Sequence, residues 1–163
     1  MTKNATKIKK NKPVDAIDRR ILNILAENAR TKLTKISKEI GISVDSTKKR
    51  MDKLEKRGAI TRYTIQIDTK EFGLDLGIHI YLKFTNLTKE RFDAFISDMM
   101  KNPRVIDLMS VLGDYDMYVV MLAKDAQELE KMKLEIKEKF MDIIADWKEV
   151  LVTKLYKLEE YKF

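Results

Sequence analysis

The feature that most constrains the fold is a single glycine placed between two segments of helical periodicity. From Leu33 to Ile40, apolar residues recur at spacings of three and four, as on one face of a helix that ends at Gly41. Two residues later Ser43, a typical helix N-cap residue, can begin a further helix that runs to about Lys56. Two helices joined by about three residues around a glycine predict a helix-turn-helix.

A helix is also expected before this pair. Asp15 is a plausible N-cap, and the apolar residues that follow it at helical spacing are Ile17, Ile21, Ile24 and Leu25. After the pair, residues 60–68 alternate in a β-like period, at the place where a wing follows a helix-turn-helix. These patterns predict a winged helix-turn-helix domain over residues 13–63 and a linker strand over residues 64–74.

The helix predicted from Ser43 to Lys56 has one apolar face and one polar, mainly basic face. Thr47, Met51 and Leu54 recur at spacings of four and three and are expected to pack against the other two helices. A buried Thr47 hydroxyl then needs a backbone acceptor. The side chains left outward are Val44, Asp45, Lys48, Lys49, Asp52 and Lys56. Such a face fits a DNA major groove, with base contacts near the helix start and phosphate contacts further along.

The charge of the chain is concentrated at one end. Residues 1–62 carry 18 Lys and Arg against 7 Asp and Glu, a net +11, whereas residues 63–163 carry 15 against 19, a net −4. Residues 1–12 hold five lysines, no acid and little apolar content, and are expected to form a flexible basic arm. This asymmetry favours a first half that binds a polyanion such as nucleic acid, although a solvated Lys-rich surface would also explain it.

After Phe72 and Gly73 the pattern changes to strand, helix and strand, repeated twice. Strands are expected at residues 77–84, 105–112, 115–123 and 150–158, with helices that begin after Thr88 and at Asp125. The order β-α-β-β-α-β predicts an α+β chain whose second domain, residues 75–163, is a ferredoxin-like sandwich with both helices on one sheet face. The other face is expected to carry Tyr81, Ser110, Tyr118, Val120 and Leu122, which predicts a homodimer formed sheet against sheet or edge against edge.

Several classes of chemistry find no support in the residues. The chain has no Cys, which removes disulfides, thiolate zinc sites and a cysteine nucleophile, and it has a single histidine, His79. Its five glycines have no phosphate-loop spacing, and no apolar run approaches the roughly 18 residues needed to span a bilayer. We therefore expect a cytoplasmic protein with no catalytic site, metal or cofactor and no membrane partner.

Short motifs along nearly the whole chain can be compared with a known family. They are VDAIDRRIL at residues 14–22, NAR at 28–30, GIS at 41–43, Arg50, LE at 54–55, GAI at 58–60 and RY at 62–63. Together they resemble the Lrp/AsnC family of prokaryotic feast/famine transcription regulators. The second half resembles the ligand-sensing (RAM-type) domain of that family, and GDYD at residues 113–116 is similar to its Gly-x-x-Asp turn.

The resemblance implies a protein that binds double-stranded DNA as dimers through a winged helix-turn-helix. It also implies an α/β domain that assembles dimers into tetramers or octamers and binds an amino acid between them. By position, the residues expected at DNA are Ser43, Asp45, Ser46, Lys48, Lys49, Arg50, Lys53, Arg57, Arg62 and Tyr63. Among them Asp45, Ser46, Lys48 and Lys49 are the expected base contacts.

The same resemblance implies an effector pocket around the second-domain turn. Its expected residues are Ser110, Leu112, Gly113, Asp114, Tyr115 and Asp116. Asp114 is expected to pair with the ammonium group of an amino acid, while Asp116 fixes the turn. Leu112 stands where many family members have a threonine whose hydroxyl can help to hold the ligand.

The resulting hypothesis is a sequence-specific DNA-binding transcription regulator that binds a pseudo-palindromic site and is modulated by an amino acid or a related small molecule. One alternative is an architectural protein that coats DNA with little sequence preference, which the Lys-rich arm and Leu112 would favour. Another is a small-molecule-binding regulatory subunit that uses the second half alone, although this leaves the +11 half unexplained.

Overall fold

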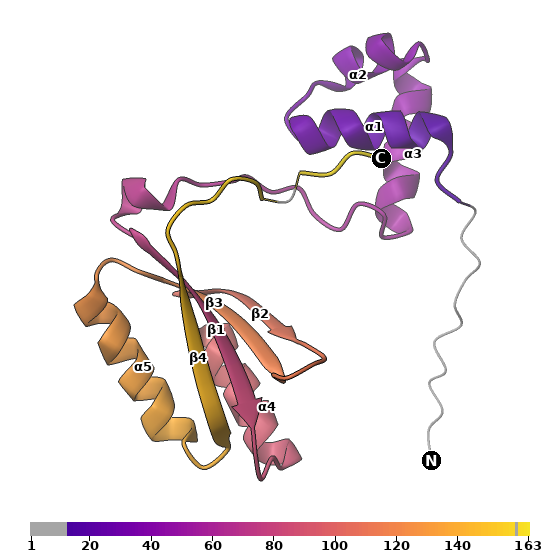
Figure 1. The fold of residues 1–163 in the computed structure, drawn as a ribbon. Coiled ribbons are helices and arrows are strands. Elements are labelled where there is room, and N and C mark those ends of the chain that lie inside the picture. The colour runs from indigo at the N-terminus through magenta and orange to yellow at the C-terminus, as the bar shows by residue number, and fades with distance from the viewer. Residues whose placement is uncertain (1–12, 159) are drawn as a thin grey trace, which may run out of the picture. The chain divides into compact units, whose positions relative to one another are not determined.

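The computed structural model describes residues 13–158 and 160–163, so the predicted basic arm, residues 1–12, lies outside the described residues. The chain forms two compact units (Figure 1). The first takes the chain up to Gln66 together with Lys157–Phe163, and the second takes Ile67–Tyr156. Within the described part of the chain, no helix has the length and apolar character needed to cross a membrane.

The first unit contains the three predicted helices: α1 (Ala16–Glu27), α2 (Leu33–Ile40) and α3 (Val44–Lys56). Helix α2 ends at Gly41, whose φ of +83° lies in the left-handed region, and Ser43 caps α3 by accepting the Ser46 N–H. The core residues are Ile21, Leu25, Ile36, Ile40 and Leu54. Thr47 is fully buried, and its hydroxyl donates to the Ser43 carbonyl oxygen at 3.0 Å, as expected.

The strand expected over residues 60–68 is wrong for the chain as described. Residues 61–68 have no regular structure and are exposed, and a short 3-10 helix, η1 (Thr69–Phe72), follows them. The alternating side chains have no neighbouring strand within the described residues, and a β-ladder forms only against a partner. A hydrogen bond joins this segment to the C-terminal part of the chain: Gln66 Nε2 donates to the Leu158 carbonyl oxygen at 3.0 Å.

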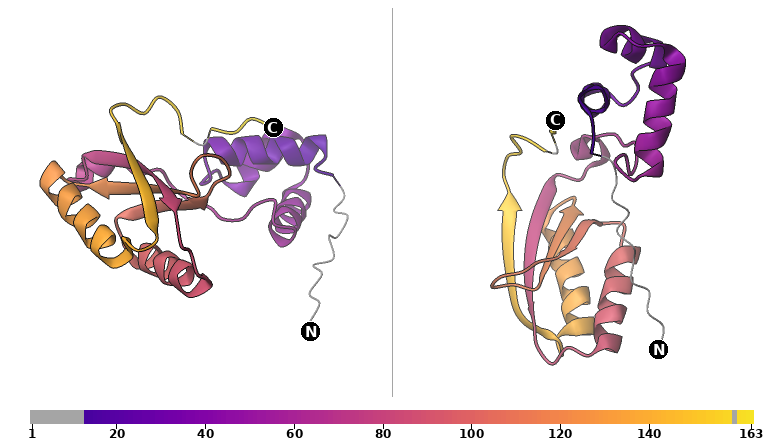
Figure 2. Two further views of the ribbon diagram at one scale, coloured as in Figure 1. Left: turned by 60° about the horizontal axis from the view of Figure 1, so that its bottom comes forward. Right: turned by 90° about the vertical axis from the view of Figure 1, so that its right-hand side faces the viewer.

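The second unit has the predicted order β1 (Leu76–Phe84), α4 (Lys89–Lys101), β2 (Val105–Ser110), β3 (Met117–Ala123), α5 (Ala126–Phe140) and β4 (Ile144–Val152). The antiparallel sheet has the strand order β2-β3-β1-β4, and both helices cover one of its faces (Figure 2). The expected βαββαβ sandwich is confirmed.

The last strand differs from its predicted position at residues 150–158. Strand β4 pairs with β1 from Phe84, opposite Ile144, to Gly77, opposite Val152. Because β1 begins at Leu76, residues beyond Val152 have almost no β1 backbone left to pair with. The predicted boundaries are therefore wrong, and the strand begins six residues earlier than the apolar pattern indicated.

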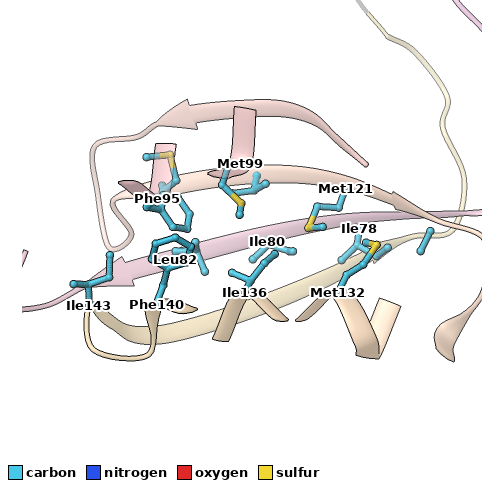
Figure 3. Packing of buried hydrophobic residues seen from close by; sticks show 13 residues of the cluster. Ile78, Ile80, Leu82, Phe95, Met99, Met121, Met132, Ile136, Phe140 and Ile143 are labelled. Atoms are coloured by element: carbon cyan, nitrogen blue, oxygen red, sulfur yellow. The ribbon is translucent and has the colours of Figure 1, made fainter. Parts of the chain in front are cut away.

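The main core lies between the sheet and the two helices (Figure 3). Alternate residues of β1 point into it, while α4 and α5 supply the opposite side. The labelled core residues are Ile78, Ile80, Leu82, Phe95, Met99, Met121, Met132, Ile136, Phe140 and Ile143. Phe95 has no exposed surface and makes edge-to-face contacts with Phe84 and Phe140.

The sheet face away from the helices carries an aromatic cluster. Tyr81 lies opposite Tyr118 on β3, and the Tyr118 hydroxyl is 2.7 Å from His79 Nδ1. Val120 and Leu122 share this face because they alternate with the core residues Val119 and Met121 along β3, and Val120 keeps only 6% of its surface exposed. Ser110 does not: it pairs with Met117, a core residue, so the register places it on the helix-covered side of edge strand β2. The expectation for Ser110 is wrong because a bulge between Val105 and Asp107 shifts the alternation of β2.

The segment Lys157–Phe163 packs with the helix-turn-helix unit, although its sequence position had assigned it to the second domain. The Asn23 side chain on α1 holds the main chain of Phe163 at two points. Its Oδ1 accepts the Phe163 N–H at 2.7 Å, and its Nδ2 donates to the Phe163 carbonyl oxygen at 3.1 Å.

Candidate nucleic-acid interface and ligand turn

The exposed side of α3 brings together the four residues expected to contact bases and Lys53, which is also expected at DNA. Asp45, Ser46, Lys48, Lys49 and Lys53 are all exposed. An ion pair joins Lys49 Nζ to Asp45 Oδ2 at 2.7 Å, with 76% and 72% of the two side chains exposed. Exposed pairs of this kind contribute little to stability, so the Lys49 ammonium can exchange this partner for another anion at small cost.

Arg50 differs from these lysines. Its Nη1 lies 2.7 Å from Asp15 Oδ2 and 2.7 Å from Asp18 Oδ1, at the N-terminus of α1. The Arg50 side chain is 30% exposed and that of Asp18 is 8% exposed. The hydrogen bond from Arg50, followed by the Asp18 N–H, holds the pKa of Asp15 below its usual value. Arg50 is thus held within the three-helix unit.

The spacing of Arg50 along α3 already indicates that it faces the other helices. Arg50 follows Thr47 by three residues and precedes Leu54 by four, which places it on the buried face of α3. A charge on such a face needs a partner, and two acids stand at the capping positions of α1, Asp15 and Asp18.

The three residues expected at DNA at and beyond the end of α3 differ in their exposure and contacts. Arg62 is exposed, and Arg57 is half-buried at the C-cap of α3. The Tyr63 hydroxyl donates to Glu55 Oε1 at 2.7 Å, so this side chain is tied to α3. Partial burial and the neighbouring Glu55 carboxylate raise the pKa of Tyr63 to about 12, so its hydroxyl stays a donor at neutral pH.

In the second unit, Asp116 binds the 111–116 turn to the end of β1. Its Oδ2 accepts the Phe84 N–H at 2.8 Å, and its Oδ1 accepts from Lys83 Nζ at 3.2 Å. The Asp116 N–H donates to the Leu82 carbonyl oxygen at 2.9 Å. The Phe84 N–H, helped by Lys83, lowers the pKa of Asp116. The carboxylate therefore stays ionised and engaged in the turn.

The other residues expected in the effector pocket differ in exposure and in their hydrogen-bond partners. Leu112 is fully exposed, and Gly113 has a φ of +150°. Asp114 is exposed, with no hydrogen bond or ion pair to any residue that the structure describes. The Tyr115 hydroxyl donates to Asp146 Oδ2 at 3.1 Å, and Ser110 is exposed at the strand end. Asp114 is thus the carboxylate of this turn that can take a ligand without breaking a contact.

Comparison with known protein families matches both units. Residues 14–55 match the AsnC-type helix-turn-helix domain, and residues 78–157 match the Lrp/AsnC ligand binding domain. The chain belongs to the Lrp/AsnC family. It is 34% identical to the transcriptional regulator LrpA of Pyrococcus abyssi over 116 residues, which are 71% of this chain and 80% of that protein. It is 29% identical to the regulator FL11 of Pyrococcus horikoshii, over 82% of this chain and 81% of that protein.

Solved structures of Lrp/AsnC proteins show the same fold. The regulator NMB0573 of Neisseria meningitidis in complex with L-Met has a TM-score of 0.81 at 21% identity, covering 90% of this chain and 94% of that one. An AsnC family regulator from Agrobacterium tumefaciens has a TM-score of 0.80 at 21% identity, covering 88% and 93%. The named Lrp/AsnC relatives are transcriptional regulators. In this member of the family, the segment that packs with the helix-turn-helix unit begins where the ligand-domain match ends.

Proposed function

We propose that this Lrp/AsnC regulator recognises a specific DNA sequence as a symmetric homo-oligomer and responds to an amino acid or a related small molecule. The observation that carries the proposal is the exposed polar and basic side of α3, presented by a correctly capped helix-turn-helix. The net charge of +11 over residues 1–62 supports it, because neutralised phosphates supply most of the affinity of such proteins. Lys48 and Lys49 would reach bases or phosphates, and Lys53 and Arg62 would reach phosphates.

The open sheet face supports the symmetric assembly. The half-buried Tyr81 and Tyr118 lie together there, with their ring centroids 5.1 Å apart. Burial of these aromatic side chains against a second copy of the chain would stabilise a dimer. A dimer, or a tetramer or octamer built from dimers, would then present two copies of α3 to DNA.

Footprinting on a selected operator tests the specificity and the symmetry together. A two-fold assembly should protect two related half-sites whose centres lie about one helical turn apart, or a multiple of it. Binding to the operator fragment should be about a thousandfold tighter than binding to random DNA at physiological salt. Footprints without a dyad would contradict the proposal, and equal affinity for random DNA would favour the architectural alternative.

Asp114 is the proposed partner of the effector ammonium. Its carboxylate is exposed and unengaged, whereas Asp116 is held by the turn. Calorimetric titration with each of the twenty amino acids, L-Met included, should find a ligand whose affinity falls about tenfold or more in Asp114→Ala, since a charge-assisted hydrogen bond is lost. Asp75→Ala removes another exposed carboxylate of this unit and should leave that affinity unchanged. No binding by the wild type, or unchanged binding by Asp114→Ala, would contradict the proposal.

A further inference from the structure

We propose that Arg50 is a positioning residue of the DNA-binding surface, which holds α3 in place on α1, and that it makes no contact with DNA. This inference rests on the proposed function, because it concerns how the basic side of α3 is presented. It removes Arg50 from the residues expected at DNA and gives the pair Asp15 and Asp18 a role in DNA binding.

The two carboxylates that hold Arg50 are themselves fixed by the main chain. Asp15 Oδ1 accepts the Asp18 N–H at 2.8 Å, and Asp18 Oδ2 accepts the Asp15 N–H at 3.4 Å, which forms a capping box. The two remaining oxygens, Asp15 Oδ2 and Asp18 Oδ1, both accept from Arg50 Nη1 at 2.7 Å. All four carboxylate oxygens are therefore used, two toward α1 and two toward α3. The guanidinium group is consequently held at a point defined by the first turn of α1.

Arg50 is well placed to set the position of the recognition helix. It is the middle residue of the 13-residue helix α3 and lies on the same face as buried Thr47 and Leu54. The apolar contacts of that face alone permit small rotations, because dispersion and hydrophobic contacts are not directional. Two charge-assisted hydrogen bonds to fixed acceptors are directional and restrict such rotation.

The presentation of two exposed lysines depends directly on this contact. Lys49 and Lys53 line the same surface hollow as Asp15, Asp18 and Arg50. Lys49 precedes Arg50 and Lys53 follows it by three residues, so both side chains turn with α3. A change in helix rotation would move their ammonium groups relative to a bound duplex.

The local charge argues against a phosphate contact by Arg50 itself. One guanidinium stands between two carboxylates, so the cluster carries a net charge of −1. A DNA phosphate that approached Arg50 would meet both carboxylates and would have to displace Asp18, whose side chain is 8% exposed. The exposed lysines beside the cluster offer a phosphate the same charge without this cost.

The test measures DNA affinity at several salt concentrations for the full chain and three variants. Arg50→Gln removes the guanidinium, Asp15→Asn weakens one ion pair but keeps the capping oxygen, and Lys53→Gln removes an exposed lysine as the matched control. A lost phosphate contact lowers the slope of log affinity against log salt by about one per protomer. Melting of each variant by circular dichroism identifies any loss of folding.

We expect Arg50→Gln and Asp15→Asn to bind the operator about tenfold more weakly while the salt slope stays that of the wild type. Lys53→Gln should lower the slope. Asp15→Asn is decisive even where Arg50→Gln unfolds, because the Asp15 side chain is half-exposed and its substitution is expected to leave the fold intact. The substitution also removes one negative charge, which makes each protomer more positive. Charge alone then predicts tighter binding, and helix positioning predicts weaker binding.

Tighter binding by Asp15→Asn would overturn the inference, as would a salt slope in folded Arg50→Gln that falls as it does in Lys53→Gln. Wild-type protein that shows no salt-dependent binding to the operator would instead contradict the proposed function. The two failures are therefore distinguishable.

Discussion

Raising the salt concentration from 50 to 200 mM should lower the affinity for the operator by about 10³- to 10⁵-fold, because DNA binding by this chain is expected to depend on phosphate neutralisation. Each protomer presents exposed lysines on α3, Lys48, Lys49 and Lys53, and Arg62 follows them. In the proposed two-fold assembly, two protomers would supply about six to ten phosphate contacts, the number for which such a loss is typical. Fluorescence anisotropy with a labelled operator over this salt range measures the slope.

A lysine variant assigns part of that slope to one residue. Lys49→Ala should weaken binding and lower the slope by about one per protomer. The variant also leaves the Asp45 carboxylate without its partner at 2.7 Å, so some of the loss at fixed salt comes from repulsion between Asp45 and DNA. Lys131→Ala removes an exposed lysine from α5 in the acidic half and should leave the slope unchanged. A slope that Lys49→Ala does not alter would remove Lys49 from the phosphate contacts.

The helices and their order follow from signals that lie close together in the sequence. Gly41, Ser43, Thr88 and Asp125 are cap residues, and each marks a helix end in the structure. Caps act within one turn, so their effect is readable without knowledge of the fold. The turn role of Asp116 was predicted in the same way, from a short acidic side chain within a turn that begins at Gly113.

The errors concern contacts between distant segments. Residues 60–68 alternate like a strand, yet a strand needs a partner that the pattern cannot supply. The side of the sheet that Ser110 faces depends on a bulge earlier in the same strand, between Val105 and Asp107. The partners of Arg50 are likewise distant in the sequence: the family resemblance places this residue at DNA by position, which stays a prediction, and in the structure it contacts Asp15 and Asp18, more than thirty residues earlier. Local patterns identified the elements, and tertiary pairing decided what their side chains contact.

Phe95→Ala should lower the free energy of unfolding of the second unit by about 3–5 kcal/mol, the usual cost of removing a fully buried phenylalanine. Phe95 has no exposed surface, and its ring makes edge-to-face contacts with Phe84 and Phe140 at centroid distances of 5.3 and 5.2 Å. Alanine would lose both aromatic contacts and leave a cavity where α4 and α5 meet the sheet. Urea unfolding at fixed protein concentration measures the change.

The location of this loss is as informative as its size. The two units have separate cores, and the core of the helix-turn-helix contains none of the Phe95 neighbours. We therefore expect the transition of the second unit to move to lower urea while the far-ultraviolet signal of the three-helix unit keeps its midpoint. Met100→Ala is the matched control, because Met100 lies on α4 with 72% of its surface exposed and should change stability by less than about 0.5 kcal/mol. Equal losses in the two variants would show that the packing around Phe95 does not hold the second unit together.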